Sequence, residues 1–395
     1  MTGGNRTVRP QLVVYVAWIT MVIATAVPAA AACQGTSCRI LVVGDMGIGD
    51  NAFAAGFLAV QQAMVKDAPD LVLFVGDYIY TSTKTTCLGQ TPAGVMPPYV
   101  AQVRDMLVTP FQGQVVFLRG DNDAPEGDKE REKAARTCWP MIAGMSAPLT
   151  RPPGATAWEG VKEDLPGVFV AALDHDALAA QKTGTLDWLR DPIQRAKAAG
   201  KWVLVVVHAP VVTTAWYEKP CCATLKPLHD MGVDLVFSGH QHSFERTYQL
   251  EIPTTPPDRI QVVQTPARAL YQAGTYQAGQ GVVYVVTGGG GAWLRPFADQ
   301  QGPPPPAEVA PPHIRRAVAR RAIMNHYVRV DLEADRVGVT TMRVCAPGEP
   351  RWKPTDATIW PGGASMLECH DKPPGVSVFD HFELTRAKPL VLEAD

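Results

Sequence analysis

Short apolar runs recur along the chain, and several of them are apolar at consecutive positions. Strands that are buried on both faces show this pattern, whereas strands with one exposed face alternate between apolar and polar residues. We therefore predict buried strands at Ile40–Val43, Leu71–Val75, Val115–Leu118, Val168–Leu173, Trp202–Val207, Leu235–Phe237, Val282–Val286 and Val328–Leu332.

Helical stretches lie between these runs, at Phe53–Lys66, Tyr99–Leu107 and Leu186–Lys197. Alternation of strands and helices predicts a layered α/β domain in which helices cover the sheets. The last fifty residues carry two cysteines, scattered Pro and Gly, and one further strand pattern at Phe379–Leu384. We therefore expect one domain over 33–344 and, over 345–395, a C-terminal extension packed on the same domain.

The N-terminus has the layout of a secretory signal peptide. Arg6 and Arg9 precede an apolar run over Leu12–Val27, which ends in the small residues Ala29–Ala32. A retained membrane anchor is the alternative, but this Ala-rich run has 16 residues, and a spanning helix needs about 20 strongly apolar ones. We predict that residues 1–32 are a signal peptide and that no stable membrane anchor remains after cleavage.

The eight cysteines lie outside the predicted signal peptide. An even number of cysteines in an exported protein favours disulfides, and the nearest pairs along the chain are Cys33 with Cys38 and Cys345 with Cys369. Cys33 directly follows Ala32, which raises a lipoprotein as an alternative, but Ala30 stands where a lipobox prefers Leu. We therefore expect a periplasmic or secreted protein with disulfide bonds.

The charge of the chain is close to neutral. It has 36 Lys and Arg against 38 Asp and Glu, a net charge of −2. Removal of residues 1–32 takes away two positive charges and leaves 34 − 38 = −4. Nucleic-acid-binding proteins carry an excess of positive charge, so we expect no nucleic-acid partner.

Side chains that can bind metal ions follow five of the predicted strands. Loops at the carboxyl ends of strands are where α/β folds bind ligands, so residues far apart in the sequence can converge there. Each motif alone is weak evidence, but three Asp or Asn positions and three His positions at strand ends make a joint pattern. The residues are Asp45, Asp77, Tyr80, Asn122, His208, His240 and His242.

These motifs resemble those of the calcineurin-like metallophosphoesterases, and within them the purple acid phosphatases. The family order GDxG, GDxxY, GNH(D/E), VxxH, GHxH is matched by GDMG at 44–47, GDYIY at 76–80, GDND at 120–123, VVVH at 205–208 and GHQH at 239–242. The resemblance covers about residues 39–332. It implies an α/β metallophosphoesterase sandwich of two β-sheets flanked by helices.

The resemblance also implies a dinuclear metal centre. One metal would be held by Asp45, Tyr80 and His242, the second by Asn122, His208 and His240, and Asp77 would bridge both. A phenolate and carboxylates suit Fe(III), and an amide with two imidazoles suits divalent Fe, Zn or Mn. A hydroxide held by two metals can attack phosphorus, so the implied activity is hydrolysis of small-molecule phosphomonoesters.

One motif departs from the family pattern. Family members place His after the ligand Asn, whereas this chain has Asp121-Asn122-Asp123. Either an extra Asp precedes the ligand Asn122, or Asp121 replaces the Asn and Asn122 replaces the His, and we prefer the first alignment. The usual His is absent in both, so Asp123 and His175 are our candidates for the catalytic acid.

Two other functions stay open from the sequence. The metal motifs are shared with phosphodiesterases and nucleotide hydrolases, so one of these is the alternative within the enzymes. A metal-binding protein with little catalysis is the alternative outside them, and the missing His favours it. Arg246, which follows GHQH in S-F-E-R, either binds substrate phosphate or forms a structural salt bridge with Glu245 or elsewhere. We prefer the structural role.

Overall fold

The computed structural model describes 33, 37–46, 48–49, 54–80, 96–123, 138–155, 159–174, 183–215, 225–252, 261–262, 273–297, 312–347 and 367–386. All of these residues belong to one compact unit. The predicted signal peptide lies outside the described residues. Among the described helices, none is long and apolar enough to cross a membrane.

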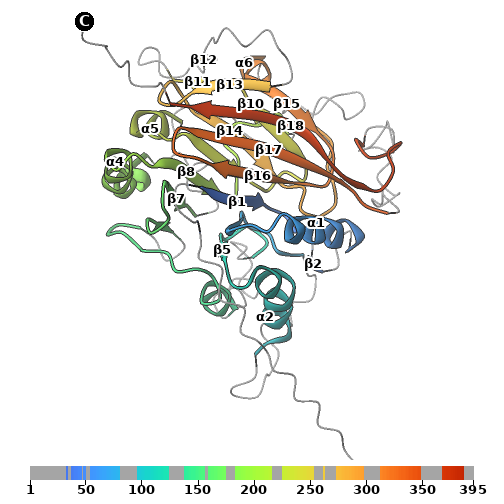
Figure 1. The fold of residues 1–395 in the computed structure, drawn as a ribbon. Coiled ribbons are helices and arrows are strands. Elements are labelled where there is room, and N and C mark those ends of the chain that lie inside the picture. Colours follow the sequence, from blue (N-terminus) through green and yellow to red (C-terminus); the bar gives the residue numbers. More distant parts are fainter. Residues whose placement is uncertain are drawn as a thin grey trace, which may run out of the picture. The chain divides into compact units, whose positions relative to one another are not determined.

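Two seven-stranded mixed sheets form the body of this unit (Figure 1). The strands of the first sheet are, in spatial order, β13 (Ala273–Gln277), β18 (Gly375–Thr385), β17 (Arg336–Cys345), β16 (His326–Leu332), β1 (Cys38–Val43), β3 (Leu71–Phe74) and β5 (Val115–Phe117). Within it, β1, β3 and β5 are parallel, whereas β16 runs antiparallel to β1.

The second sheet also combines a run of parallel strands with antiparallel ones. Its strands are, in spatial order, β15 (Val318–Ala322), β10 (Phe244–Thr247), β14 (Val283–Thr287), β9 (Leu235–Ser238), β8 (Trp202–Val207), β7 (Val168–Ala172) and β6 (Gly160–Lys162). Here β7, β8, β9 and β14 are parallel. Two short pairs, β2 (Ile48–Gly49) with β4 (Ile79–Tyr80) and β11 (Leu250–Glu251) with β12 (Gln261–Val262), complete the described strands.

The central strands are buried on both faces, as the apolar runs predict. In β1, Ile40 and Val42 join the core between the two sheets, while Leu41 and Val43 pack in a second cluster with helix α1. Successive strand residues point to opposite faces, so a strand covered on both sides needs apolar residues throughout. The predicted sandwich of two β-sheets flanked by helices is confirmed.

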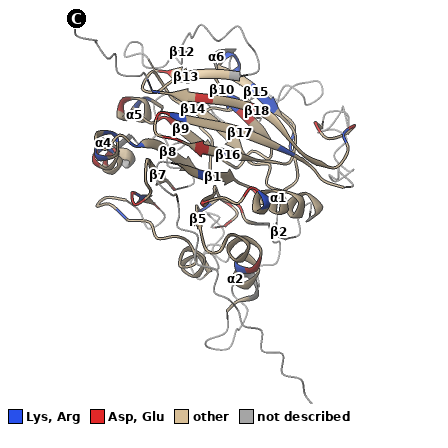
Figure 2. Ribbon diagram, in the orientation of Figure 1, with Lys and Arg blue, Asp and Glu red and all other residues tan. Residues whose placement is uncertain are grey.

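The helices cover the outer faces of the sheets. Helix α1 packs on the first sheet, and α4 and α5 pack on the second. Figure 2 shows charges of both signs on α4 and α5, whereas the central strands β8 and β9 carry none. The described helices are α1 (Ala54–Lys66), α2 (Pro98–Val103), α4 (Arg190–Ala198), α5 (Leu225–Met231) and α6 (Pro312–Ala317), with a π-helical turn at Arg104–Val108 and 3-10 turns at Thr109–Phe111 and Thr183–Leu189.

The C-terminal segment contributes a strand to the first sheet. β18 lies between β17 and β13, antiparallel to the former and parallel to the latter. A disulfide joins Cys345, the last residue of β17, to Cys369, and another joins Cys33 to Cys38. Both local pairings predicted from the sequence are therefore present.

Candidate metal centre

His208 and His240 follow the parallel neighbours β8 and β9. His208 is buried, and its Nδ1 lies 2.7 Å from the carbonyl oxygen of Val75, so Nδ1–H donates to that carbonyl. Its Nε2 faces Asp121 Oδ1 at 2.9 Å and Asp77 Oδ1 at 3.5 Å. A hydrogen bond at Nδ1 fixes the tautomer of a metal-binding histidine and leaves Nε2 as the ligand atom.

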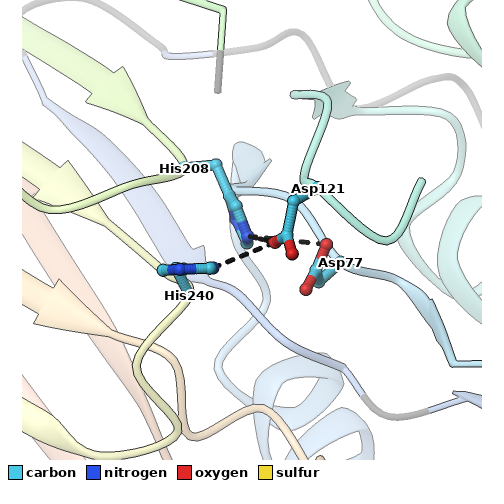
Figure 3. A group of neighbouring side chains, drawn as sticks. All are labelled: Asp77, Asp121, His208 and His240. Carbon is cyan, nitrogen blue, oxygen red and sulfur yellow. Dashed lines mark hydrogen bonds and ion pairs between the residues drawn. The ribbon is translucent and has the colours of Figure 1, made fainter. Parts of the chain in front are cut away.

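Asp77 and Asp121 come from the first sheet and meet these histidines. Figure 3 shows the Asp121 carboxylate facing both imidazole rings, with Asp77 beside it. Asp121 Oδ1 lies 2.9 Å from both His208 Nε2 and His240 Nδ1. One ligand atom from each of these four residues falls within 4.8 Å of the others. The edge of the sandwich therefore brings together two carboxylates and two imidazoles from four loops.

Asn122 lies next to this group in a different role. Its backbone N–H donates to Asp77 Oδ1 at 2.8 Å, and its side-chain amide donates to Asp77 Oδ2 at 2.6 Å. Asp121, and not Asn122, is the residue of this turn whose side chain contacts the imidazoles. Which of the two would bind a metal stays a prediction. The ungapped match of GDND to GNH(D/E) is the sequence signal that pointed to Asp121.

A separate group of donors forms around Asp45, which follows β1. Asp45 Oδ1 lies 3.2 Å from His242 Nε2, and His242 Nδ1 lies 2.5 Å from the carbonyl oxygen of Trp293. Asp45 Oδ2 accepts the backbone N–H of His240 at 2.8 Å. Because His240 also contacts Asp121 through its ring, the two groups are immediate neighbours.

The backbone at these positions is unusual. Asp45, Asp77 and His240 have φ angles of 58°, 55° and 66°, in the left-handed region that disfavours side chains. Close packing also restricts the neighbouring positions, since a Cβ on Gly120 would overlap the Asp77 carboxylate. Non-glycine residues in such conformations cluster at functional sites, where the surrounding structure holds them.

Asp123 is buried beneath the site and binds backbone amides. Its Oδ2 accepts the N–H groups of Asp77 and Gly120 at 2.8 and 2.9 Å, and its Oδ1 accepts that of Tyr78 at 3.2 Å. Burial and the charge of Asp77 raise the pKa of Asp123 to about 8. These contacts tie the loop after β3 to the loop after β5. A catalytic role for Asp123 stays a prediction.

The charges in the centre stabilise one another. Burial alone would lower the pKa of His208, but the charge of Asp77 and the hydrogen bonds to Asp121 and Asp77 raise it well above its ordinary value. Burial would raise the pKa of Asp77 and of Asp121, but contact with His208, and for Asp121 also with His240, lowers both. A metal ion needs the neutral imidazole, so a cation and a proton compete for His208.

The donor set fits metal ions. Asp45 and Asp77 are 0% and 1% exposed, and Asp121 adds a third carboxylate beside them. Burial of like charges is unfavourable unless a cation compensates them. Carboxylate and imidazole are the ligands that Fe, Zn and Mn bind in proteins.

The structure does not describe the side chains of two predicted site residues, Tyr80 and His175. The backbone of Tyr80 is in β4, where it pairs with Gly49 of β2, but its side chain lies outside the described part. His175 also lies outside it. The preceding residue, Asp174, forms a two-point ion pair with Arg119 just before the GDND motif, with both N–O distances 2.9 Å.

Arg246 and Glu245 point to different partners. Arg246 pairs with Asp380, as the preferred structural role predicts, and Glu245 binds the loop that follows His208. Glu245 accepts a hydrogen bond from the Thr213 hydroxyl at 2.5 Å and from the backbone N–H of Thr214 at 2.9 Å. Glu245 therefore supports the site from outside it, whereas Arg246 joins β10 to β18.

Comparisons with known proteins agree with this geometry. Purple acid phosphatase 15 of Arabidopsis thaliana is 24% identical over 244 residues, which are 55% of this chain and 43% of the relative. The chain thus spans less than half the length of that relative. Among solved structures, purple acid phosphatase PPD1 from yellow lupin (Lupinus luteus) seeds has a TM-score of 0.54 at 15% identity, covering 89% of this chain and 54% of that one.

PhoD has a TM-score of 0.53 at 11% identity, covering 90% of this chain and 71% of that one. At these identities the two solved structures show a shared fold alone. The family model of the calcineurin-like phosphoesterases matches residues 38–244, which include all five motifs and make up more than half of the chain. The chain therefore belongs to the calcineurin-like phosphoesterase family, a family of hydrolases, and within it resembles the purple acid phosphatases.

Proposed function

We propose that the chain is an exported, metal-dependent phosphoesterase that hydrolyses phosphomonoesters at a dinuclear centre. The observation that supports this best is the position of His240. Its backbone N–H binds Asp45 and its ring contacts Asp121, so it joins the two donor groups. Two cations in adjacent groups would activate water and neutralise charge on a phosphoester.

The ligand sets follow from the two groups. One cation would be held by Asp45, Tyr80 and His242, and the other by Asp121, His208 and His240, with Asp77 between them. The pairing of Tyr80 with Gly49 supports its place in the first set, because β2 follows the loop that carries Asp45. The chain's own contribution is to hold these donors, through Val75, Trp293 and the Asp123 carboxylate, before the cations bind.

The test is metal-dependent activity of the mature protein and of Asp77→Ala. We expect close to two cations per chain, loss of activity on chelation, and loss of both cation binding and activity in Asp77→Ala. Asp230→Ala is the control, because Asp230 is exposed and pairs with Lys226 on α5. Metal content and rate that survive Asp77→Ala would refute the dinuclear proposal.

The substrate class needs a matched pair of esters. We expect faster hydrolysis of phosphomonoesters than of phosphodiesters with the same leaving group. A reversed preference would identify a phosphodiesterase or nucleotide hydrolase of the same family. Stoichiometric metal binding without hydrolysis of either ester would identify a binding protein.

The identity of the first metal depends on Tyr80. If its phenolate binds Fe(III), the protein shows a visible charge-transfer colour that Tyr80→Phe abolishes, while the divalent site keeps its metal. A colourless protein that contains only Zn²⁺ or Mn²⁺, and that Tyr80→Phe does not change, would exclude iron and leave the phosphoesterase proposal standing.

Export is tested by the mass of the mature chain. All five described cysteines are in disulfides, which supports an oxidising compartment. We expect a mature N-terminus near Ala32 or Cys33 and few free thiols. Retention of residues 1–30 together with eight alkylatable thiols would refute export.

A further inference from the structure

The donor group that comprises Asp77, Asp121, His208 and His240, the second donor group, has a carboxylate beside its two imidazoles. Asp121 Oδ1 is equidistant from His208 Nε2 and His240 Nδ1, at 2.9 Å from each. The Asp121 side chain is 43% exposed, so one side of it faces solvent, while His208 is buried. Asp121 is therefore placed to contact both a bound cation and a ligand that arrives from solvent.

The neutral amide beside it serves a different carboxylate. Asn122 donates two hydrogen bonds to Asp77, one from its backbone and one from its side chain. The side-chain amide therefore supports the carboxylate between the two groups. The second donor group thus contains two carboxylates, Asp77 and Asp121, where the family motif supplies one carboxylate and one amide.

We propose that Asp121 makes this centre retain its second cation more tightly, and bind phosphate anions less tightly, than an amide at the same position would. The inference rests on the proposed dinuclear function. Its basis is charge: an aspartate and an asparagine have nearly the same shape, but only the aspartate brings a full negative charge to the cation.

Tighter retention of the cation is expected from the charge of its ligands. Sites built from oxygen ligands are tuned over orders of magnitude by the number of charged ligands, and carboxylates suit hard cations such as Mn²⁺. Asp121 lies where its charge acts on the same ion as His208 and His240. Its conversion to an amide should weaken retention of that ion at least about tenfold, which corresponds to about 1.4 kcal/mol.

Weaker binding of phosphate is expected from the net charge of the centre with its two cations bound. With two divalent cations, Asp45, Asp77 and Asp121 leave one net positive charge, and asparagine at position 121 would leave two. The same difference holds for Fe(III) with a divalent ion when Tyr80 is a phenolate. Because phosphate is an anion, the centre with Asp121 attracts it less strongly, and product release is correspondingly easier.

The experiment compares Asp121→Asn with the wild type as metal-loaded, full-length mature protein. Cation retention is measured as metal lost to a competing chelator, and phosphate binding as titration of inorganic phosphate at saturating Mn²⁺. We expect the variant to lose one of its two cations at a chelator concentration at least about tenfold lower, and to bind inorganic phosphate several-fold more tightly.

Three variants make the result specific. Asp230→Asn removes one negative charge at an exposed site on α5 and should change neither measurement. Asp121→Glu keeps the charge, so its phosphate affinity should stay near that of the wild type even if the longer side chain binds the cation less well. Asn122→Ala should leave phosphate affinity nearer the wild-type value than Asp121→Asn does, because it keeps all three carboxylates.

Unchanged cation retention and unchanged phosphate affinity in a folded Asp121→Asn would overturn the inference while leaving a two-metal wild type intact. Loss of the second cation from Asn122→Ala but not from Asp121→Asn would also overturn it and would make Asn122 the ligand. A wild-type chain that binds no cation would instead refute the proposed function itself, and the inference with it.

Discussion

The ion pair between Arg246 and Asp380 joins the two sheets through the core. Arg246 lies on β10 of the second sheet and Asp380 on β18 of the first, and their side chains are 4% and 2% exposed. The N–O distances are 2.5 and 3.1 Å, and Arg246 also donates to the Tyr276 hydroxyl at 2.9 Å. Burial opposes the guanidinium charge, but Asp380 raises the pKa of Arg246, so the charge persists.

Removing one partner should therefore be costly. Asp380→Asn leaves the guanidinium charged and buried without its counter-ion, and loss of one member of a buried pair costs about 3 to 5 kcal/mol. The guanidinium keeps its contact with the Phe382 ring, whose centroid is 5.0 Å away, which offsets only part of this cost. We expect Asp380→Asn to lower the free energy of unfolding by about 3 kcal/mol.

The assay is urea unfolding followed by tryptophan fluorescence, with a double-mutant cycle. Arg246→Met combined with Asp380→Asn should cost less than the sum of the single changes by about 2 kcal/mol, because the double variant leaves no charge at position 246. Arg320, which also pairs with Asp380 at 3.8 Å, is partly exposed and keeps contact with water. Arg336→Met is the control, since its ion pairs with Glu333 and Glu383 are exposed and should contribute less than about 1 kcal/mol. A cost for Asp380→Asn no larger than that of the control would refute the reasoning.

Three further predictions concern other residues. Burial lowers the pKa of His326 from 6.5 to about 4, so at this residue the unfolded chain binds more protons than the folded one between these values. The contribution of His326 to stability is then full above about pH 6.5 and falls by about 3 kcal/mol toward pH 4. His326→Asn should flatten this acid limb in pH-dependent unfolding, whereas His370→Asn, at an exposed site, should not. Asp123→Asn should slow aryl and alkyl phosphate hydrolysis alike, because one of its backbone-binding oxygens becomes an NH₂ group; a loss confined to the alkyl ester in paired assays would instead identify Asp123 as the acid. The Cys345→Ser and Cys369→Ser double variant should lower the unfolding free energy by about 3 kcal/mol, because the disulfide closes a loop with a sequence separation of 24; calorimetry that finds no change would contradict this.

Most of the strands that the sequence predicted are apolar throughout, whereas β10 and β15, two of the strands that it did not predict, carry charges. Runs such as Trp202–Val207 are apolar throughout because both faces are covered, and these are all present as strands. β10 reads Phe-Glu-Arg-Thr and β15 reads Val-Ala-Arg-Arg-Ala. Their charged residues interrupt the apolar pattern, so the sequence did not predict them as strands. In β10 the charges are buried because Glu245 and Arg246 have partners from distant parts of the chain, which a local pattern does not reveal.

Part of the candidate site could also be predicted from the sequence, and part could not. The order of the motifs was enough to predict that Asp45, Asp77, His208, His240 and His242 converge, because each follows a strand in one edge of the sandwich. The order of the motifs was not enough to choose between Asp121 and Asn122, because both side chains can bind metals and they are neighbours in the sequence. The choice depends on the three-dimensional turn, in which Asp123 binds the backbone of Gly120 and Asp121 contacts the His208 imidazole.

The left-handed backbone at Asp45, Asp77 and His240 has a consequence for any attempt to improve this protein. Glycine adopts such φ angles without steric cost, whereas other residues pay about 1 kcal/mol or more for them, Asp and Asn somewhat less. Replacing any of the three with glycine would remove a predicted metal ligand and relieve local strain at once. A selection for heat resistance alone would therefore favour sequences that have lost the centre, so stability and metal content have to be scored together.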